Sequence, residues 1–409
     1  MKLYDDLKWR GLIKDITNPE LEEKLNNGGM TFYWGTDPSA DSLHIGHFSS
    51  LLMAKRLENY GHKPIILVGG ATGLIGDPRP TTERPMITKE AVLHNYECIK
   101  AQIKNIFGYE VVNNYDWCKD INFIDFLRDY GKFFNINYML SKDIIKRRLD
   151  EGITYTEFSY MIMQALDFEY LYRTKGCTLQ AAGQDQWGNI TSGVELIRKK
   201  HNEEVYAFTM PLVTDKYGNK IGKTSGNAVW LDKEKFSSYE MYQYLINTDD
   251  TCVIDYLKKL TLLSKEEIER IEKIHFENPE LRIAQKELAK QIITLLHSAD
   301  DYENATEISE NLFSGNIKNI SSKDLMIGLK GVPSFKVELN KTLIDVLTSN
   351  NICSSKREAR EFLNSSAITI NGDIIKDENL IIDSSYLIDN KLLVIRRGKK
   401  KYYLGVFGE

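Results

Sequence analysis

The first 220 residues alternate strand-like with helix-like segments, and this alternation constrains the fold more than any other feature. Residues 30–35 (MTFYWG) and 64–70 (PIILVGG) have the composition of buried strands, and shorter strands are predicted at 178–182 and 205–210. Apolar spacing predicts helices over 46–60, 88–107, 156–173 and 185–200, and residues 71–80 form a turn-rich loop. Such alternation is typical of a parallel sheet with helices on both faces. We therefore predict an α/β domain with a Rossmann-like parallel sheet.

The remainder of the chain changes character twice. Residues 236–314 show helical patterns throughout, and residues 315–340 carry linker signals (GNIKNISS and GVPSF). Two short helices and strands at 368–372, 386–389 and 391–398 follow, with Asn371-Gly372 as a hairpin turn. We predict a catalytic α/β domain with a helical connective insertion over 1–228, an all-α domain over 229–320, a linker over 321–342, and a small α+β domain over 343–409.

Composition indicates a cytoplasmic protein. The 409 residues are 42% hydrophobic and 27% charged, and no apolar run approaches the roughly 20 residues of a membrane span, so no membrane partner is expected. The N-terminus lacks the apolar core of a signal peptide. Five scattered cysteines contain no C-x-x-C pair, which argues against a disulfide framework or a metal cage, and we expect no protein metal site.

Two histidines stand at the predicted start of the helix over 46–60. His44 and His47, three residues apart, can present both rings on one side and donate hydrogen bonds to phosphate oxygens. A helix N-terminus beyond a strand of a parallel sheet attracts anions, and Gly35 and Gly46 let a backbone or ligand approach closely. A metal pair or two ordinary surface histidines are the alternatives, but a third metal ligand is not found nearby.

Two lysines, Lys220 and Lys223, stand on a loop after the strand over 205–210. Alone, the spacing K-x-G-K is common in solvated turns. In combination with the histidine pair, it favours a site for a polyphosphate whose α-phosphorus is attacked. A nicotinamide enzyme is disfavoured, because G-x-x-G-x-x-G at 70–76 lacks the acidic residue that follows a dinucleotide fingerprint.

The segments GTDPSADSLHIGH (35–47) and KIGKTSG (220–226) resemble the two signature motifs of class I aminoacyl-tRNA synthetases. The segments GGATGLIGDP (69–78), FSYMIMQALDF (158–168) and GQDQWGNI (183–190) resemble bacterial-type tyrosyl-tRNA synthetases, and the similarity extends along nearly the whole chain. The tryptophan-specific sister family and an inactive RNA-binding scaffold derived from a synthetase are the alternatives. Both signature histidines and both signature lysines are present, which disfavours the scaffold.

The resemblance implies that a substrate carboxylate attacks the α-phosphorus of ATP and that pyrophosphate leaves with Mg²⁺ as its counterion. The carboxylate is already anionic, so catalysis rests on positioning and on charge stabilisation. The matching catalytic residues are His44, His47, Lys220, Lys223 and Thr224. Residues that match the ATP site are Gly35, Asp37, His44, Gly46, His47, Gly183, Asp185 and Lys223.

The resemblance also implies a tyrosine site. Tyr33 and Asp167 match residues that bond the phenol, and the residues that match the rest of the substrate site are Asp77, Tyr160, Gln164 and Gln186. The spacing of Tyr160, Gln164 and Asp167 independently places them on one helix face. A polar stripe facing solvent is the alternative interpretation.

One departure from the family concerns a lysine that often follows the GDP turn. This chain has Asp77-Pro78-Arg79-Pro80-Thr81-Thr82-Glu83-Arg84 instead, so Arg79 or Arg84 is the candidate replacement.

The last 67 residues resemble the small RNA-binding domain that is shared with a ribosomal small-subunit protein, through SSKREAREFLNSSAITINGDII (354–375). Lys356, Arg357 and Arg360 lie on broadly one face of its first helix, where cations contact phosphates. A solvated charged helix is the alternative. The resemblance implies that this domain binds the tyrosine tRNA and that the protein is a homodimer.

Overall fold

The computed structural model describes residues 1–78, 86–149, 152–222, 228–329, 332–398 and 401–408. Contacts divide the chain into two compact units, which are Met1–Phe236 with Ile246–Leu296, and Ser237–Leu245 with His297–Glu409. The helices of residues 236–314 are therefore shared between both units. The four-part division at residues 228, 320 and 342 stays a prediction.

The first unit contains the predicted parallel sheet, with strand order β1-β6-β5-β2-β3-β4. All neighbouring strands are parallel except β1, which pairs antiparallel with β6. This sheet confirms the α/β fold class. The strands are β1 (Asp15–Ile16), β2 (Thr31–Thr36), β3 (Lys63–Val68), β4 (Val111–Asn113), β5 (Cys177–Gly183) and β6 (Tyr206–Met210).

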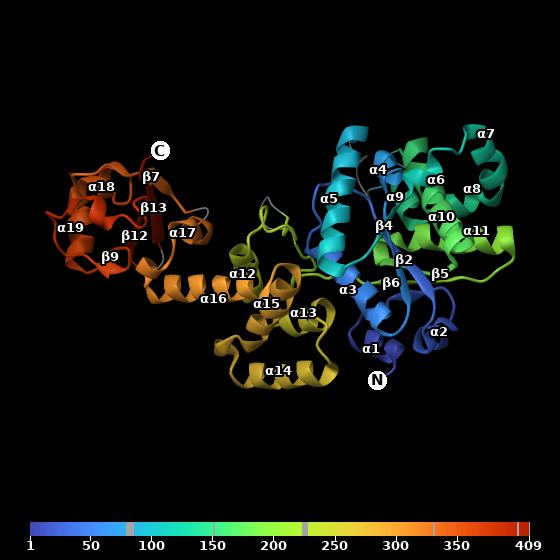
Figure 1. Ribbon diagram of the computed structural model, residues 1–409, viewed down its shortest axis with the longest axis horizontal. Helices are drawn as coiled ribbons and strands as arrows, with labels where there is room; N and C mark the ends of the chain where they lie inside the picture. The colour runs from blue at the N-terminus through green and yellow to red at the C-terminus, as the bar shows by residue number, and fades with distance from the viewer. Residues whose placement is uncertain (79–85, 150–151, 223–227, 330–331, 399–400, 409) are drawn as a thin grey trace. The chain divides into compact units, whose positions relative to one another are not determined.

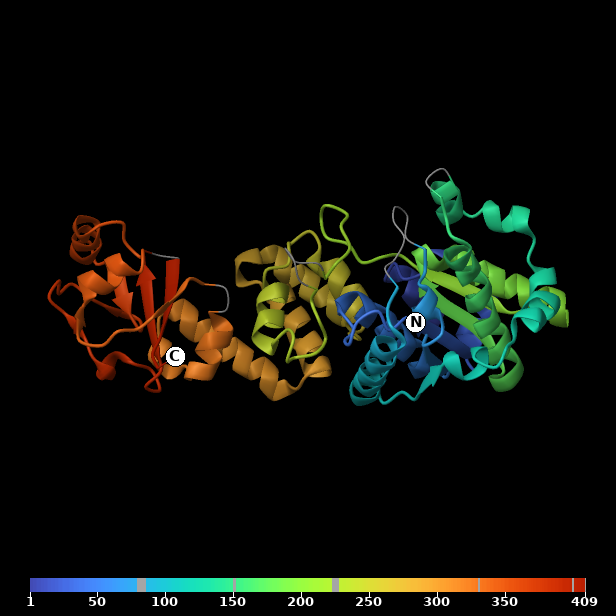
Figure 2. The same ribbon diagram turned by 90° about the horizontal axis from the view of Figure 1, so that it is seen from above.

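Four long helices cover the sheet. Since parallel crossovers are right-handed, α3 (Ile45–Asn59) and α5 (Lys89–Phe107) lie on one face, while α10 (Tyr155–Lys175) and α11 (Trp187–His201) lie side by side on the other (Figures 1 and 2). The loop expected over 71–80 contains a short helix, α4 (Thr72–Ile75). The remaining elements before β5 are α1 (Leu3–Trp9), α2 (Leu21–Asn27), α6 (Tyr115–Cys118), α7 (Phe123–Asp125), a π-helical turn (Phe126–Tyr130), a 3-10 turn (Gly131–Phe133), α8 (Ile136–Leu140) and α9 (Asp143–Leu149).

Three further helices complete the first unit: α13 (Val253–Leu260), α14 (Lys265–Glu277) and α15 (Ile283–Leu296), with a 3-10 turn (Pro279–Leu281) between the last two. Ser264 caps α14 through a capping box with Glu267. The sequence SKEE (264–267) has the residue spacing that is typical of this box. Among the described residues, no helix is long and apolar enough to cross a membrane.

The second unit is built on a five-stranded sheet of order β10-β9-β12-β13-β7. Its strands are β7 (Ser334–Lys336), β9 (Ile368–Ile370), β10 (Asp373–Ile374), β12 (Leu392–Arg397) and β13 (Lys401–Val406), and β8 (Lys341–Thr342) pairs separately with β11 (Ile381–Ile382). Its helices are α12 (Ser238–Ile246), α16 (Ala299–Ser314), α17 (Ser322–Gly328), α18 (Leu343–Ser349) and α19 (Lys356–Asn364), with a 3-10 turn at Ile317–Asn319.

The elements predicted from the sequence differ from those observed in this unit in three places. Residues 321–342, expected as a linker, contain α17 and β7, and β7 pairs parallel with β13. The strand expected over 386–389 is wrong: a 3-10 turn ends at Tyr386, and only Ile388 makes an isolated bridge. The strand β13 was not expected, because KYYLG lacks the clear apolar alternation of a strand.

The tail sheet shares a core with helices that precede it. Leu392, Val394 and Leu404 pack with Ile308 and Leu312 of α16. The predicted hairpin turn is confirmed, because Asn371 and Gly372 join β9 and β10 with φ angles of 49° and 95°.

We predict that Gly372→Ala destabilises the second unit. An added Cβ would lie 1.8 Å from the Gly315 carbonyl oxygen, so the hairpin must move away from the end of α16. The expected result is a lower urea concentration at the unfolding midpoint of this unit. Hydrogen exchange of the backbone amides in residues 343–409 measures that midpoint. Gly398→Ala is the matched control, since Gly398 has a φ of 66° and nothing within 4 Å of an added Cβ. It should cost only the left-handed strain of about 1–2 kcal/mol. Equal losses in both variants would contradict the steric explanation.

Candidate active site

The carboxyl ends of β2, β3 and β5 meet at one edge of the first sheet, where ligands of parallel sheets bind. Gly69 follows β3 and permits this meeting, because an added Cβ would lie 2.0 Å from Thr72 Oγ1 and 2.5 Å from Asp37 Oδ1. The Thr72 hydroxyl donates to Asp37 Oδ1 at 2.6 Å. Gly35, at the end of β2, has ordinary space around it, with Leu67 3.5 Å from an added Cβ.

The two histidines cap the start of α3. The Gly46 N–H donates to His44 Nδ1 at 3.1 Å, and the His44 N–H donates to His47 Nδ1 at 3.2 Å. Since each Nδ1 accepts a hydrogen bond, a neutral ring carries its proton on Nε2. The rings stack with centroids 3.9 Å apart. An added Cβ on Gly46 would lie 2.9 Å from His44 Cε1, so glycine is needed for this cap.

Burial, followed by the neighbouring His44, lowers the pKa of His47 to about 3. The ring of His47 is therefore neutral at physiological pH and acts as a hydrogen-bond donor without a positive charge. The backbone N–H groups and dipole of the α3 N-terminus add a further attraction for an anion.

The stem of the lysine loop lies directly on the start of α3. The Ile45 N–H donates to the Val229 carbonyl at 3.0 Å, and the Leu231 N–H donates to the Leu43 carbonyl at 2.8 Å. Gly222, with a φ of 89°, packs so closely that an added Cβ would lie 2.6 Å from Ile45 Cγ2. The structure thus brings together the two motifs that are about 175 residues apart in sequence.

Lys220 lies on the hairpin before this stem, and its Nζ pairs with Asp185 Oδ2 at 3.2 Å. Asp185 belongs to the 3-10 turn Gln184–Gln186, which follows Gly183 at the end of β5. Lys223, Thr224, Arg79 and Arg84 lie outside the described residues.

A buried hydrogen-bond network occupies the centre of the site. Tyr160 on α10 donates to Asp37 Oδ2 at 2.9 Å, while Asn114 donates to Thr72 Oγ1 at 2.9 Å and to Asp167 Oδ2 at 3.0 Å. The Trp117 indole donates to Asp167 Oδ1 at 2.9 Å. The network therefore fixes both oxygens of the Asp167 carboxylate.

The sequence analysis missed Thr72, Asn114 and Trp117 as members of this network. Asn114 is the one of the three that the sequence could have indicated, because a polar residue directly after the strand β4 lies at the ligand-binding edge of the sheet. No sequence pattern indicates the role of Trp117, because that role depends on how the short helix α6 packs against α10.

Tyr33 and Asp167 form a buried polar pair. Burial raises the pKa of Asp167 to about 7, against the effect of the hydrogen bonds from Asn114 and Trp117. Burial and the nearby Asp167 carboxylate raise the pKa of Tyr33 well above its ordinary value. The Tyr33 hydroxyl has no hydrogen-bond partner in the described part of the chain. A buried donor without a partner beside a carboxylate suits a hydroxyl group of a ligand.

Three carboxylates surround Tyr160. Burial and the charges of Asp37, Asp77 and Asp167 raise the pKa of Tyr160 well above its ordinary value. Asp77 accepts hydrogen bonds from Gln186 at 2.8 Å and Asn189 at 3.1 Å. Gln164 lies partly exposed on α10 between Tyr160 and Asp167. This concentration of negative charge suits a cationic group of a ligand.

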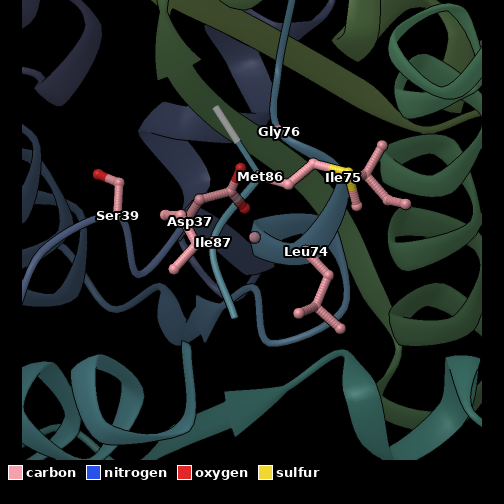
Figure 3. Close-up of a pocket in the computed structure, with 8 residues that line it drawn as sticks. Asp37, Ser39, Leu74, Ile75, Gly76, Met86 and Ile87 are labelled. Carbon is pink, nitrogen blue, oxygen red and sulfur yellow. The ribbon is translucent and has the colours of Figure 1, made fainter. Parts of the chain in front are cut away.

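A small pocket opens beside Asp37 (Figure 3). Its wall is formed by the α4 segment and by the two residues that resume the described chain after residue 85. The lining residues are Asp37, Ser39, Gly73, Leu74, Ile75, Gly76, Met86 and Ile87. Within the described residues, no three His, Cys, Asp or Glu side chains gather in positions to hold a metal ion.

The basic residues of the tail lie at the start of α19. Lys356 pairs with Asp345 at 2.8 Å, Arg357 with Glu361 at 3.1 Å and Arg360 with Glu378 at 3.0 Å. All three cations are exposed, so their ion pairs are weak and open to exchange for a polyanion.

Residues 25–314 match the family described as tRNA synthetases class I (W and Y), and residues 324–405 match the tyrosine–tRNA ligase SYY-like C-terminal domain. The tyrosine–tRNA ligase of Streptococcus gordonii is 48% identical over 415 residues, covering 99% of each chain. The tyrosine–tRNA ligase of Streptococcus agalactiae is equally similar.

Solved structures are also similar. A C-terminally truncated mitochondrial tyrosyl-tRNA synthetase of Aspergillus nidulans has a TM-score of 0.67 and 29% identity, covering 76% of this chain and 94% of its own. A tryptophanyl-tRNA synthetase of Encephalitozoon cuniculi, at 17% identity and a TM-score of 0.55, covers 75% of this chain and 89% of its own and shares the fold. From the family match and full-length identity, the chain belongs to the class I tRNA synthetases, among the bacterial tyrosine–tRNA ligases.

Proposed function

We propose that this chain activates tyrosine with ATP, giving tyrosyl-adenylate and pyrophosphate, and then transfers tyrosine to the 3′ end of the tyrosine tRNA. One observation carries the assignment of the site: the backbone at the histidine cap of α3 is hydrogen-bonded to the stem of the lysine loop, which joins the two signature motifs.

In the first step, the tyrosine carboxylate attacks the α-phosphorus of ATP and the bond to pyrophosphate breaks. The nucleophile needs no general base, so the protein positions the reactants and stabilises the charge that moves to the leaving group. We assign Nε2–H donors to His44 and His47, positive charge to Lys220 and Lys223, and a catalytic role to Thr224, which follows Lys223 in the sequence. Lys220, now paired with Asp185, would exchange that partner for a phosphate.

The ATP site in this proposal is formed by the ends of β2 and β5 and the start of α3, namely Gly35, Asp37, Gly46, Gly183 and Asp185. Mg²⁺ enters with ATP as the counterion of its phosphates and therefore as part of the substrate.

The selection of tyrosine follows from the polar pair. The substrate phenol would accept from the Tyr33 hydroxyl and donate to Asp167, while Asp77, Tyr160 and Gln164 would receive the α-ammonium group and Gln186 would orient Asp77. A site built to bond a hydroxyl rejects the analogue that lacks it; the general illustration of this rule is itself a tyrosyl-tRNA synthetase discriminating against phenylalanine.

We further propose that the active form is a homodimer. The insertion between β4 and α10 exposes large apolar side chains, which a second copy would cover. These residues are Phe123, Ile124, Leu127, Ile136, Tyr138 and Leu149, and Tyr155 at the start of α10 is also exposed. A cytoplasmic location is supported by the five free cysteines.

Amino-acid-dependent ATP–pyrophosphate exchange, measured without tRNA for each of the twenty amino acids, tests the proposed activation. We expect exchange with tyrosine alone, because only its phenol satisfies both Tyr33 and Asp167. Exchange with tryptophan would overturn that assignment, and exchange with none would overturn the proposed reaction.

The pKa of Asp167 predicts pH-dependent binding of tyrosine. As pH falls through about 7 the ligand-free carboxyl of Asp167 becomes protonated and is then a weaker acceptor for the phenol, so the Kd for tyrosine should rise as pH falls from 8 to 6. Binding can be followed by equilibrium dialysis. In Asp167→Asn the same profile should be flat and the affinity lower throughout; a parallel slope in both proteins would contradict the assignment.

The stability of the ligand-free protein should depend on pH in the opposite direction to tyrosine binding, and Asp167→Asn tests this. A raised pKa means that folding favours the protonated carboxyl, so the parent protein loses stability as pH rises from about 4 through about 7. The variant should therefore gain melting temperature over the parent at pH 8 and show little gain at pH 5.

The tail cations predict where tRNA affinity originates. Replacing Lys356, Arg357 and Arg360 by alanine should lower kcat/KM for tRNA at least 10-fold, on the order expected for three phosphate contacts, and reduce its salt dependence. Adenylate formation should be unchanged. The matched control, Glu361→Gln with Glu378→Gln, breaks two of the same ion pairs but keeps the cations, so charging should persist. Equal loss in both sets would contradict direct phosphate contact.

A further inference from the structure

The hairpin that carries Lys220 is a stiff element. Thr214 and Lys220 form a bridge, and the Ile221 N–H donates to the Val213 carbonyl at 2.9 Å. Asp215 holds the turn, since its Oδ1 accepts from the N–H groups of Tyr217 and Asn219 at 2.9 Å. A hairpin of this kind moves as one piece, so its outside contacts determine where Lys220 lies.

Two of those contacts come from the segment at the start of α13. The Tyr256 hydroxyl donates to the Thr214 carbonyl at 3.1 Å, and the Lys216 ammonium pairs with Asp249 Oδ2 at 2.7 Å. Tyr256 is only 5% exposed, and its hydrogen bond to the Thr214 carbonyl is partly buried. Asp249 is itself oriented, because its other oxygen accepts from the Thr251 N–H at 3.0 Å and the Thr251 hydroxyl at 2.7 Å.

The other end of α13 is fastened to the α/β core by two buried arginines. Arg10 donates to the Lys258 carbonyl at 3.0 Å and to the Leu263 carbonyl at 2.6 Å, while Asp6 accepts from its Nε at 2.9 Å. Arg56 of α3 donates to the carbonyls of Lys258, Lys259 and Thr261. Helix C-terminal carbonyls lack partners within the helix, and guanidinium groups both satisfy them and match the negative end of the dipole.

We propose that α13 is a positioning strut for the hairpin that carries Lys220. Arg56 connects the end of α13 to the helix that carries the histidine pair. Tyr256 connects α13 to the hairpin, and Lys216 connects the hairpin to Asp249 in the segment just before α13. The distance between the signature histidines and Lys220 is thereby set by α13 as well as by the stem. Tyr256 and Lys216 are positioning residues, and this inference rests on the proposed roles of Lys220 and Lys223 toward the ATP phosphates.

The test measures pre-steady-state adenylate formation by the full-length chain as a function of ATP, at saturating tyrosine. Tyr256→Phe removes one buried hydroxyl and should slow the step about 3- to 10-fold, the range for one hydrogen bond. Lys216→Gln should slow it about 2- to 5-fold, the range for a surface ion pair. The Kd for tyrosine should not change, because the contacts of the hairpin described above are with Asp185, Asp249 and Tyr256, none of which is assigned to the phenol or the ammonium group.

Two variants separate positioning from a general loss of stability. Lys216→Arg keeps the charge and should restore the parent rate. Asp255→Asn breaks the Lys259–Asp255 pair, which lies within α13 and does not touch the hairpin, so it should leave the rate unchanged. Parent rates in Tyr256→Phe and Lys216→Gln would overturn the strut, as would an equal loss of tyrosine affinity or an equal slowing in Asp255→Asn.

Lys220→Ala, measured in parallel, separates a failure of the proposed role of Lys220 from a failure of the proposed role of α13. If this variant forms adenylate at the parent rate, the proposed role of Lys220 fails and the strut fails with it. If it is slow while Tyr256→Phe and Lys216→Gln are normal, only the strut is rejected.

Discussion

The backbone pairing of residues 229–231 with residues 43–45 is the constraint on which the site depends. It joins the start of α3 to the far end of the lysine loop through two hydrogen bonds that need no particular side chain. The side-chain requirement falls instead on Gly222 and Gly46, where an added Cβ would collide with Ile45 and His44. The two motifs are therefore joined through the backbone, with the histidines at the start of α3 after β2 and Lys220 paired with Asp185 after β5.

The buried network around Asp167 holds polar groups that are costly to keep in the ligand-free protein. An isolated carboxylate in the interior is costly, and the donors Asn114 and Trp117 only partly compensate, since the pKa of Asp167 is still raised to about 7. The Tyr33 hydroxyl adds a second unsatisfied group. In the proposed function, a substrate phenol would satisfy both groups at once.

The C-terminal region behaves as a larger body than its sequence pattern indicates. The tail sheet buries Leu392, Val394 and Leu404 against α16, and β7 enters the sheet beside β13. A separation at residue 343 would expose that core. The cations of α19, to which we assign tRNA binding, therefore belong to a unit that comprises Ser237–Leu245 and His297–Glu409.

The sequence by itself determined the alternation that produces a parallel sheet, the helix caps, the hairpin at Asn371-Gly372 and the residue types of both signature motifs. These features are local, because periodicity, capping and turn chemistry depend on residues a few positions apart. Tertiary structure alone decided that Asn114 and Trp117 hold Asp167, that residues 321–342 join the tail and that α13 contacts the hairpin of Lys220. Each of these depends on segments distant in the chain that meet only when the core packs, and no local pattern encodes such a meeting.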